Sequence, residues 1–162
     1  MSLFKTERLS VIEIQSDDWQ DTLVSDLFSL LSPNVVQFLP PDLQDIHSAQ
    51  DFHLWLKQMQ TQARIFVIHA KQNDQPIGMI YLSEHDSVGH LGYWLGEAFW
   101  GKGFAQELLQ GLVVWAKQAT QLKLLSGGVD HDNQASSHVL RKLGFQPASD
   151  SSGVSHYVYH MS

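Results

Sequence analysis

Cysteine is absent from this chain of 162 residues, which excludes disulfide bonds, thiolate nucleophiles and cysteine-based metal sites. No run of apolar residues approaches the roughly 20 that a membrane-spanning helix needs, and residues 1–10 lack the apolar segment of a signal peptide. The 9 histidines form no HExxH zinc motif. We therefore expect a cytoplasmic protein with no metal site and no membrane contact.

Positive charge is scarce, because 10 Lys and Arg residues stand against 17 Asp and Glu residues, for a formal net charge of −7. Nonspecific nucleic-acid binding depends on neutralising phosphates with basic side chains, so no nucleic-acid partner is expected. The acidic balance suits a cationic partner such as an amine, although acidity alone more often only confers solubility.

Hydrophobic periodicity predicts one α/β (α+β) domain over residues 1–162. Alternating, β-branched segments predict strands at residues 9–14, 65–69, 77–83, 89–95, 122–129, 145–148 and 154–161. Apolar residues three and four apart predict helices at residues 19–31, 49–59, 104–119 and 133–143, the first with a start signal at Ser16, Asp17 and Asp18. This order predicts a mostly antiparallel sheet of six to seven strands flanked by about four helices. Gly127 and Gly128 are expected to interrupt their strand.

A glycine-spaced loop precedes the predicted helix at residues 104–119. Gly101 and Gly103 have no side chains, so the amides of this loop can approach a ligand closely. The helix leaves its first N–H groups unpaired at its positive end, which suits a phosphate, with Lys102 adding charge at the rim. The dinucleotide fingerprint needs a glycine where Gln106 stands, and the P-loop needs Ser or Thr after its lysine, so neither matches. A tight turn without a ligand is the alternative for this loop alone.

Four segments, in order and at suitable separations, resemble the GNAT superfamily, and most closely its RimJ/RimL-like branch of N-terminal and small-amine acetyltransferases. They are Thr6-Glu7-Arg8-Leu9, Gly92-Tyr93-Trp94-Leu95, Trp100-Gly101-Lys102-Gly103-Phe104-Ala105, and Asn133-x-x-Ser136 with Lys142-Leu143-Gly144-Phe145. The resemblance covers nearly the whole chain. It implies a GNAT-type domain, acetyl-CoA as the donor, and a primary amine as the acceptor, either a protein N-terminus or a small molecule. It leaves monomer and homodimer open.

The resemblance also implies how coenzyme A binds. Amides of the glycine loop would grip the pyrophosphate, and the strand before it would splay from its neighbour at a bulge and pair with the pantetheine arm. A main-chain N–H near Trp94 or Leu95 would polarise the thioester carbonyl. Asn133 would hydrogen-bond the pantetheine or its neighbouring loop. The implied cofactor-binding residues are Tyr93, Trp94, Leu95, Trp100, Gly101, Lys102, Gly103, Phe104, Ala105 and Asn133.

Direct transfer fits this sequence, because it offers neither a cysteine nor a GxSxG elbow to form an acyl-enzyme. The leaving thiolate then needs a proton donor. Many GNAT proteins use a tyrosine where Leu140 stands here, and in the RimJ/RimL-like branch the serine matching Ser136 is the substitute. The alternative for Ser136 is a serine that satisfies amides at a helix start, with Asn133 as the N-cap.

The incoming amine must lose a proton, and the base is the second open question. The family often has a carboxylate where His90 stands, and a histidine titrating near neutrality is a reasonable replacement. A strand-edge histidine without a catalytic role is the alternative. Glu84, His85, Asp130 and a bound water are further candidates. A non-catalytic acyl-CoA-binding module is the alternative to an enzyme.

Overall fold

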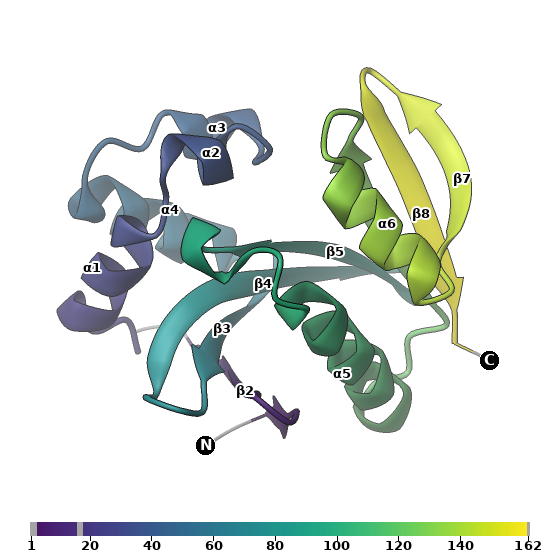
Figure 1. Cartoon of the computed structure of the whole chain (residues 1–162), viewed down its shortest axis with the longest axis horizontal. Helices are drawn as coiled ribbons and strands as arrows, with labels where there is room; N and C mark the ends of the chain where they lie inside the picture. Colours follow the sequence, from purple (N-terminus) through teal and green to yellow (C-terminus); the bar gives the residue numbers. More distant parts are fainter. Residues whose placement is uncertain (1–2, 16–17, 162) are drawn as a thin grey trace.

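The computed structural model describes residues 3–15 and 18–161, in which eight strands form one sheet with helices on both faces (Figure 1). The strands are β1 (Phe4–Lys5), β2 (Leu9–Glu13), β3 (Arg64–Ala70), β4 (Gln75–His85), β5 (Val88–Leu95), β6 (Leu124–Asp130), β7 (Gln146–Ser151) and β8 (Val154–His160). The helices are α1 (Asp21–Ser29), α2 (Pro33–Val36), α3 (Pro41–Gln44), α4 (Ala49–Met59), α5 (Phe104–Ala119) and α6 (Gln134–Lys142), with a 3-10 turn η1 at Glu97–Phe99. The strand order is β1-β2-β3-β4-β5-β6-β8-β7, and only β5 and β6 pair in parallel.

Every predicted helix and strand is present, and the structure adds β1, α2, α3 and η1. The sequence pattern marks the prolines at 33 and 41 as breaks, but each occupies the first turn of a four-residue helix. Proline is tolerated there because the first helical N–H has no partner within the helix. Ser32 caps α2 by accepting a hydrogen bond from the amide of Val35 at 3.4 Å. The helix start predicted at Ser16 and Asp17 lies outside the described residues.

The predicted interruption at Gly127 and Gly128 is wrong. Strand β6 runs unbroken through both glycines, which pair with Tyr157 and His156 of β8. Pairing on the β8 side therefore overrides the weak strand propensity of glycine. A Cβ atom at Gly128 would lie 3.2 Å from Val154 Cγ1, so the small residue also fits a close packing contact.

The sheet separates two hydrophobic cores. Helices α5 and α6 cover one face, where the core contains Phe66, Leu91 and Leu112, and the layer α1 to α4 covers the other, where it contains Phe52 and Trp94 (Figure 1). Successive strand residues point to opposite faces, so neighbours on β5 contribute to different cores.

Strands β5 and β6 diverge after a short paired stretch. Their register runs from Val88 opposite Leu124 to Leu91 opposite Gly127 and then ends, while β6 continues along β8 to Asp130. The predicted splay is thus present, but without a bulge in β5, whose register with β4 is unbroken along its length. Residues 92–95 consequently have no strand neighbour on the β6 side.

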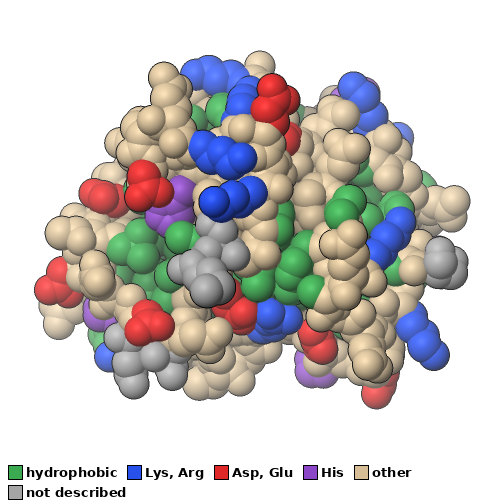
Figure 2. Space-filling model, turned by 90° about the horizontal axis from the view of Figure 1, so that it is seen from below, with side chains coloured by type: hydrophobic (Ala, Val, Ile, Leu, Met, Phe, Trp, Pro, Cys, Tyr) green, Lys and Arg blue, Asp and Glu red, His purple; other side chains and the backbone are tan. Residues whose placement is uncertain are grey.

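Charged side chains of both signs are interspersed on the face that Figure 2 shows, with hydrophobic side chains between them. Within residues 3–15 and 18–161, none of the helices combines the length and the apolar character required to cross a membrane.

Candidate active site

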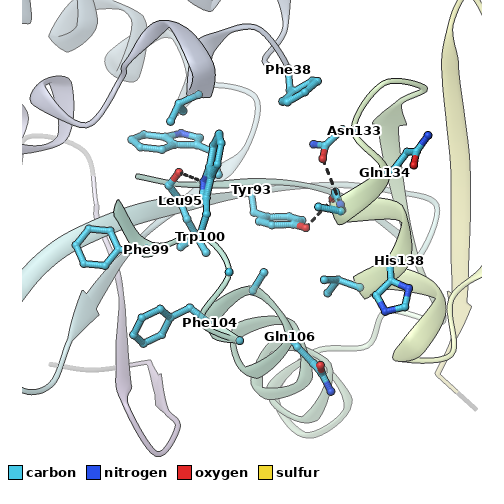
Figure 3. Close-up of a pocket in the computed structure, with 18 of the residues that line it drawn as sticks. Phe38, Tyr93, Leu95, Phe99, Trp100, Phe104, Gln106, Asn133, Gln134 and His138 are labelled. Carbon is cyan, nitrogen blue, oxygen red and sulfur yellow. Dashed lines mark hydrogen bonds between the residues drawn. The ribbon is translucent and has the colours of Figure 1, made fainter. Parts of the chain in front are cut away.

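A cavity of about 610 Å³ lies between the end of β5, the loop before α5, the start of α6 and the short helix α2 with the segment after it. Its walls therefore come from three stretches of the chain, residues 35–39, 93–106 and 132–139, which meet beside the divergence of β5 and β6 (Figure 3).

The glycine loop presents unengaged main-chain donors at this cavity. Gly101 and Gly103 have φ angles of +70° and +81°, in the left-handed region that favours glycine. Gly103 is the N-cap residue of α5 and makes no side-chain cap hydrogen bond. Within the described part of the chain, the amides of residues 101–106 donate no hydrogen bond. Free amides at the positive end of a helix dipole are an arrangement that suits an anion.

Arg8, which directly precedes β2, fixes the position of this loop. Its Nη1 donates to the carbonyl oxygen of Lys102 at 3.0 Å, its Nε forms an ion pair with Glu107 at 2.7 Å, and its guanidinium lies 4.1 Å from the centre of the Phe104 ring. The hydroxyl of Thr6 donates to the other oxygen of Glu107. Sequence reasoning used Thr6 and Arg8 only as marks of a resemblance, and no local signal pointed to partners about 100 residues away.

The electrostatics of Glu107 follow from these contacts. Partial burial acts to raise the pKa of its carboxyl group, but hydrogen bonds from Thr6 and Arg8, and the positive charge of Arg8, outweigh it and lower the pKa. Glu107 is therefore ionised near neutral pH, as its role in fixing Arg8 requires.

Ser136 and Tyr93 meet inside the cavity (Figure 3). The phenol oxygen of Tyr93 lies 2.6 Å from Ser136 Oγ, and the amide of Ser136 donates to Asn133 Oδ1 at 3.2 Å. The prediction that Asn133 is the N-cap of this helix is confirmed. The hydroxyl of Ser136 is thus bonded to a side chain on β5 rather than to a helix amide. Burial raises the pKa of Tyr93, and the hydrogen bond with Ser136 lowers it in part.

Of the remaining cofactor-binding candidates, all but Lys102 line the cavity, including Trp94 and Leu95. Trp94 is 4% exposed and turns its indole to the α1–α4 face, where Nε1 donates to the hydroxyl of Tyr81 at 2.7 Å. Trp100 is 42% exposed at the cavity and donates from Nε1 to the carbonyl oxygen of Leu95 at 2.9 Å. Phe104 and Ala105 line the cavity. Lys102 is exposed and lies outside the lining residues.

The predicted bases do not line the cavity. His90 is exposed, its ring centre is 5.8 Å from that of His85, and it lies three residues from Tyr93, hence on the opposite face of β5. Glu84 is also exposed, and Asp130 accepts a hydrogen bond from the amide of Asp132 at 2.8 Å.

Two titratable groups that sequence reasoning missed, Asp132 and His138, do line the cavity. Leu140, at the position of the usual family tyrosine, is 1% exposed and belongs to the core. In the described ranges, the structure has no cluster of three or more His, Asp or Glu side chains that could hold a metal ion.

The wall opposite the glycine loop is apolar and consists of Val35, Phe38 and Leu39. Glu97 fixes this wall, because its two carboxylate oxygens accept hydrogen bonds from Ser32 Oγ at 2.8 Å and Asn34 Nδ2 at 2.9 Å. These contacts join the start of α2 to the turn η1 that leads into the glycine loop.

The chain belongs to the GNAT acetyltransferase family, because the sequence profile of the acetyltransferase (GNAT) domain matches residues 8–146. It is 27% identical over 158 residues to the N-acetyltransferase p20 of Bacillus licheniformis, an alignment that covers 90% of this chain and 83% of that protein. The chain is therefore an N-acetyltransferase of this family.

Two solved structures illustrate the shared fold. The structure of RimL, a ribosomal L7/L12 alpha-N-protein acetyltransferase in complex with coenzyme A, superposes on this chain with a TM-score of 0.80 at 19% sequence identity. The superposition covers 99% of this chain and 98% of the RimL chain. The structure of the microcin C7 self-immunity acetyltransferase MccE, in complex with acetyl-CoA and AMP, superposes with a TM-score of 0.74 at 17% sequence identity. This superposition covers 95% of this chain and 93% of the MccE chain.

Proposed function

We propose that this chain transfers the acetyl group of acetyl-CoA directly to a primary amine in the cavity beside β5. The observation that carries the proposal is the set of unengaged amides at residues 101–106, which sit at the start of α5 and face the same cavity as Ser136. Acetyl-CoA supplies the activated acyl group, and the chain supplies the groups that bind, orient and stabilise it.

The donor half of the site supports a bound coenzyme A. The amides of residues 101–106 would hold the pyrophosphate, because they have no acceptor among the described residues and lie at the start of a helix, where an anion is favoured. Residues 92–95 have a strand edge free of β6, and an edge of this kind can pair with the amides of an extended ligand. Asn133 and Trp100 line the path between these two features.

The acid candidate Ser136 lines this cavity, whereas the base candidate His90 does not. Ser136 would place its hydroxyl near the sulfur, since it faces the cavity from the first turn of α6. The base is still assigned to His90 as a prediction. From its exposed place on the other face of β5, it would act through bound water.

The acceptor is proposed to be the amino terminus of a peptide or protein with an apolar group beside the amine. The wall of Val35, Phe38 and Leu39 supports this, because apolar surface favours an apolar neighbour of the amine. Among the residues that line the cavity, Asp132 is the single carboxylate that a polyamine could meet. RimL, whose fold is shared, is an alpha-N-protein acetyltransferase, which agrees with this choice.

Two measurements test the proposal in sequence. Calorimetry with acetyl-CoA should give saturable binding, and absence of heat at millimolar ligand with folded protein would contradict the donor site. Thiol release from acetyl-CoA should then increase with peptides that have an apolar first residue and less with spermidine. Preference for the polyamine would contradict the acceptor class, and binding without thiol release for any amine would mark a non-catalytic acyl-CoA-binding module.

A further inference from the structure

The phenol of Tyr93, on β5, contacts the predicted acid Ser136, and the implied cofactor-binding role of Tyr93 does not explain this contact. Its oxygen lies 2.6 Å from Ser136 Oγ, inside the normal range for an O–H···O hydrogen bond. The two side chains come from β5 and α6, whose strand and helix are fixed by separate contacts with the main core. The pair is therefore a built contact across the cavity rather than a chance approach of two surface groups.

The direction of this hydrogen bond follows from the acidity of the two groups. Either oxygen can donate, because each hydroxyl carries one proton and two acceptor sites. A phenol has an ordinary pKa of about 10 and is a stronger donor than an alkyl hydroxyl. Tyr93 therefore donates to Ser136 Oγ, and the remaining O–H of Ser136 is left to point elsewhere.

The surroundings of Ser136 restrict where that O–H can point. The amide of Ser136 is already bound by Asn133, so the cap position at the helix start is filled. Tyr93 occupies an acceptor site of Ser136 Oγ, and the cavity lies on the open side. Within the described residues, Ser136 Oγ has no protein partner besides Tyr93, so its O–H is free to point into the cavity, where the sulfur of coenzyme A is proposed to sit.

We propose that Tyr93 is a positioning residue for Ser136: its phenol donates to Ser136 Oγ and so directs the Ser136 O–H at the leaving sulfur. This inference rests on the proposed function for the placement of coenzyme A. When the carbon–sulfur bond breaks, its electron pair stays on sulfur, and the Ser136 O–H stabilises the resulting negative charge by a hydrogen bond. Tyr93 keeps its own proton throughout, in agreement with the raised pKa that burial gives it.

The contact between Tyr93 and Ser136 also compensates for the missing family tyrosine that would act as the acid. Leu140 replaces the tyrosine that many family members have on this helix, and its side chain is fully enclosed by the core. An isolated serine hydroxyl rotates freely and is a weak donor. When a serine hydroxyl accepts a hydrogen bond from a phenol, its rotation is restricted. Its O–H is also more polarised, since hydrogen bonds in a chain strengthen one another.

The test uses the full chain with Tyr93→Phe, Ser136→Ala and the double variant. Tyr93→Phe should lower the single-turnover rate of thiol release about tenfold, the size expected for the loss of one hydrogen bond that fixes the Ser136 hydroxyl. In the Ser136→Ala background the same change should have no effect, because Tyr93 acts only through Ser136. Affinity for coenzyme A should stay within a factor of about two, since the pyrophosphate contacts are untouched.

A second readout does not depend on catalysis. The thiol pKa of bound coenzyme A, followed by the ultraviolet absorbance of the thiolate, should rise by about one unit in Tyr93→Phe and in Ser136→Ala, because each removes stabilisation of the thiolate. If the unaltered protein binds coenzyme A but transfers no acetyl group, this shift still decides the role of Tyr93 while the proposed function fails.

Tyr159→Phe is the matched control, because it removes a phenol that accepts from Lys117 Nζ at 3.0 Å and does not line the cavity. It should leave both readouts unchanged. An unaltered thiol pKa in Tyr93→Phe would overturn the inference. So would rate losses that multiply in the double variant, or a loss of coenzyme A affinity equal to the loss in rate.

Discussion

The two walls of the cavity are built from different parts of the polypeptide. The donor wall, residues 101–106 with Asn133 and Ser136, presents main-chain amides and two polar side chains at helix starts. The acceptor wall, Val35, Phe38 and Leu39, presents apolar side chains from α2 and the segment after it. The donor wall depends mainly on backbone shape, whereas the acceptor wall depends on side-chain identity.

This difference explains why the donor is easier to infer than the acceptor. Main-chain donors require particular φ angles, and those angles leave a trace in the sequence as Gly101 and Gly103. Apolar side chains on a four-residue helix leave no comparable trace, because the same residues fill any core. A donor site is thus recognisable by pattern, and an acceptor site needs coordinates.

The largest expected effect comes from the donor wall. Gly103→Ala should weaken coenzyme A binding about tenfold or more, because a left-handed φ costs a residue with a Cβ about 1–2 kcal/mol and the loop would relax away from its anion-binding shape. Calorimetry with coenzyme A measures this loss.

Gly153→Ala provides the matched control. Gly153 has the same φ of +81° in the turn between β7 and β8, away from the cavity, and a Cβ there would meet no atom within 4 Å. Both variants should lose similar unfolding stability in urea, but only Gly103→Ala should lose coenzyme A affinity. Equal affinity in the two variants would show that the loop shape does not matter for binding.

A substitution in the acceptor wall should weaken binding of the amine and leave binding of coenzyme A unchanged. Phe38→Ala should raise KM for an apolar peptide amine about tenfold while leaving coenzyme A affinity unchanged, because burying an aromatic side chain contributes about 1.5–3 kcal/mol. Initial-rate kinetics with varied peptide separate the two constants. Leu54→Ala, at a residue that is 62% exposed on α4, should change neither. A parallel loss of coenzyme A binding in Phe38→Ala would erase the distinction between the walls.

The smallest effect is expected at Glu97, whose hydrogen bonds connect the acceptor wall to the turn before the glycine loop. Hydrogen bonds from Asn34 and Ser32 lower the pKa of Glu97 below its ordinary value of 4.5. A carboxyl group with a lowered folded-state pKa stabilises the fold above its unfolded-state pKa, and that contribution is lost as the pH falls through the folded-state pKa. The unaltered protein should therefore lose slightly more stability than Glu97→Gln on acidification below 4.5.

Urea unfolding midpoints at neutral pH and in acid measure this difference, which should be small because the carboxylate of Glu97 is exposed and solvent screens it. Asp21→Asn, at an exposed residue in the first turn of α1, is the control for removing a surface carboxylate. An acid response of Glu97→Gln identical to that of the unaltered protein would show that the link carries no stability.

Prediction from the sequence succeeded where the determining interactions are local. The amphipathic pattern of α5, the glycines before it and the Asn133 cap each involve residues within a few positions, and all three are present as predicted. The assignment of β6 failed at Gly127 and Gly128, because pairing with β8 outweighs local propensity. The base candidate His90 is on the face of β5 opposite Tyr93, and alternation alone cannot tell which face adjoins a cavity.

By itself the sequence determined the order of the longer elements, the glycine loop before α5 and membership in an acetyltransferase family, because periodicity, glycine spacing and helix caps act over short distances. Only the tertiary structure decided that Arg8 holds the glycine loop, that Tyr93 contacts Ser136 and that Phe38 faces them across the cavity. The two hydrogen bonds join residues 94 and 43 positions apart, and their geometry depends on where β5 leaves β6 and on how the two cores pack.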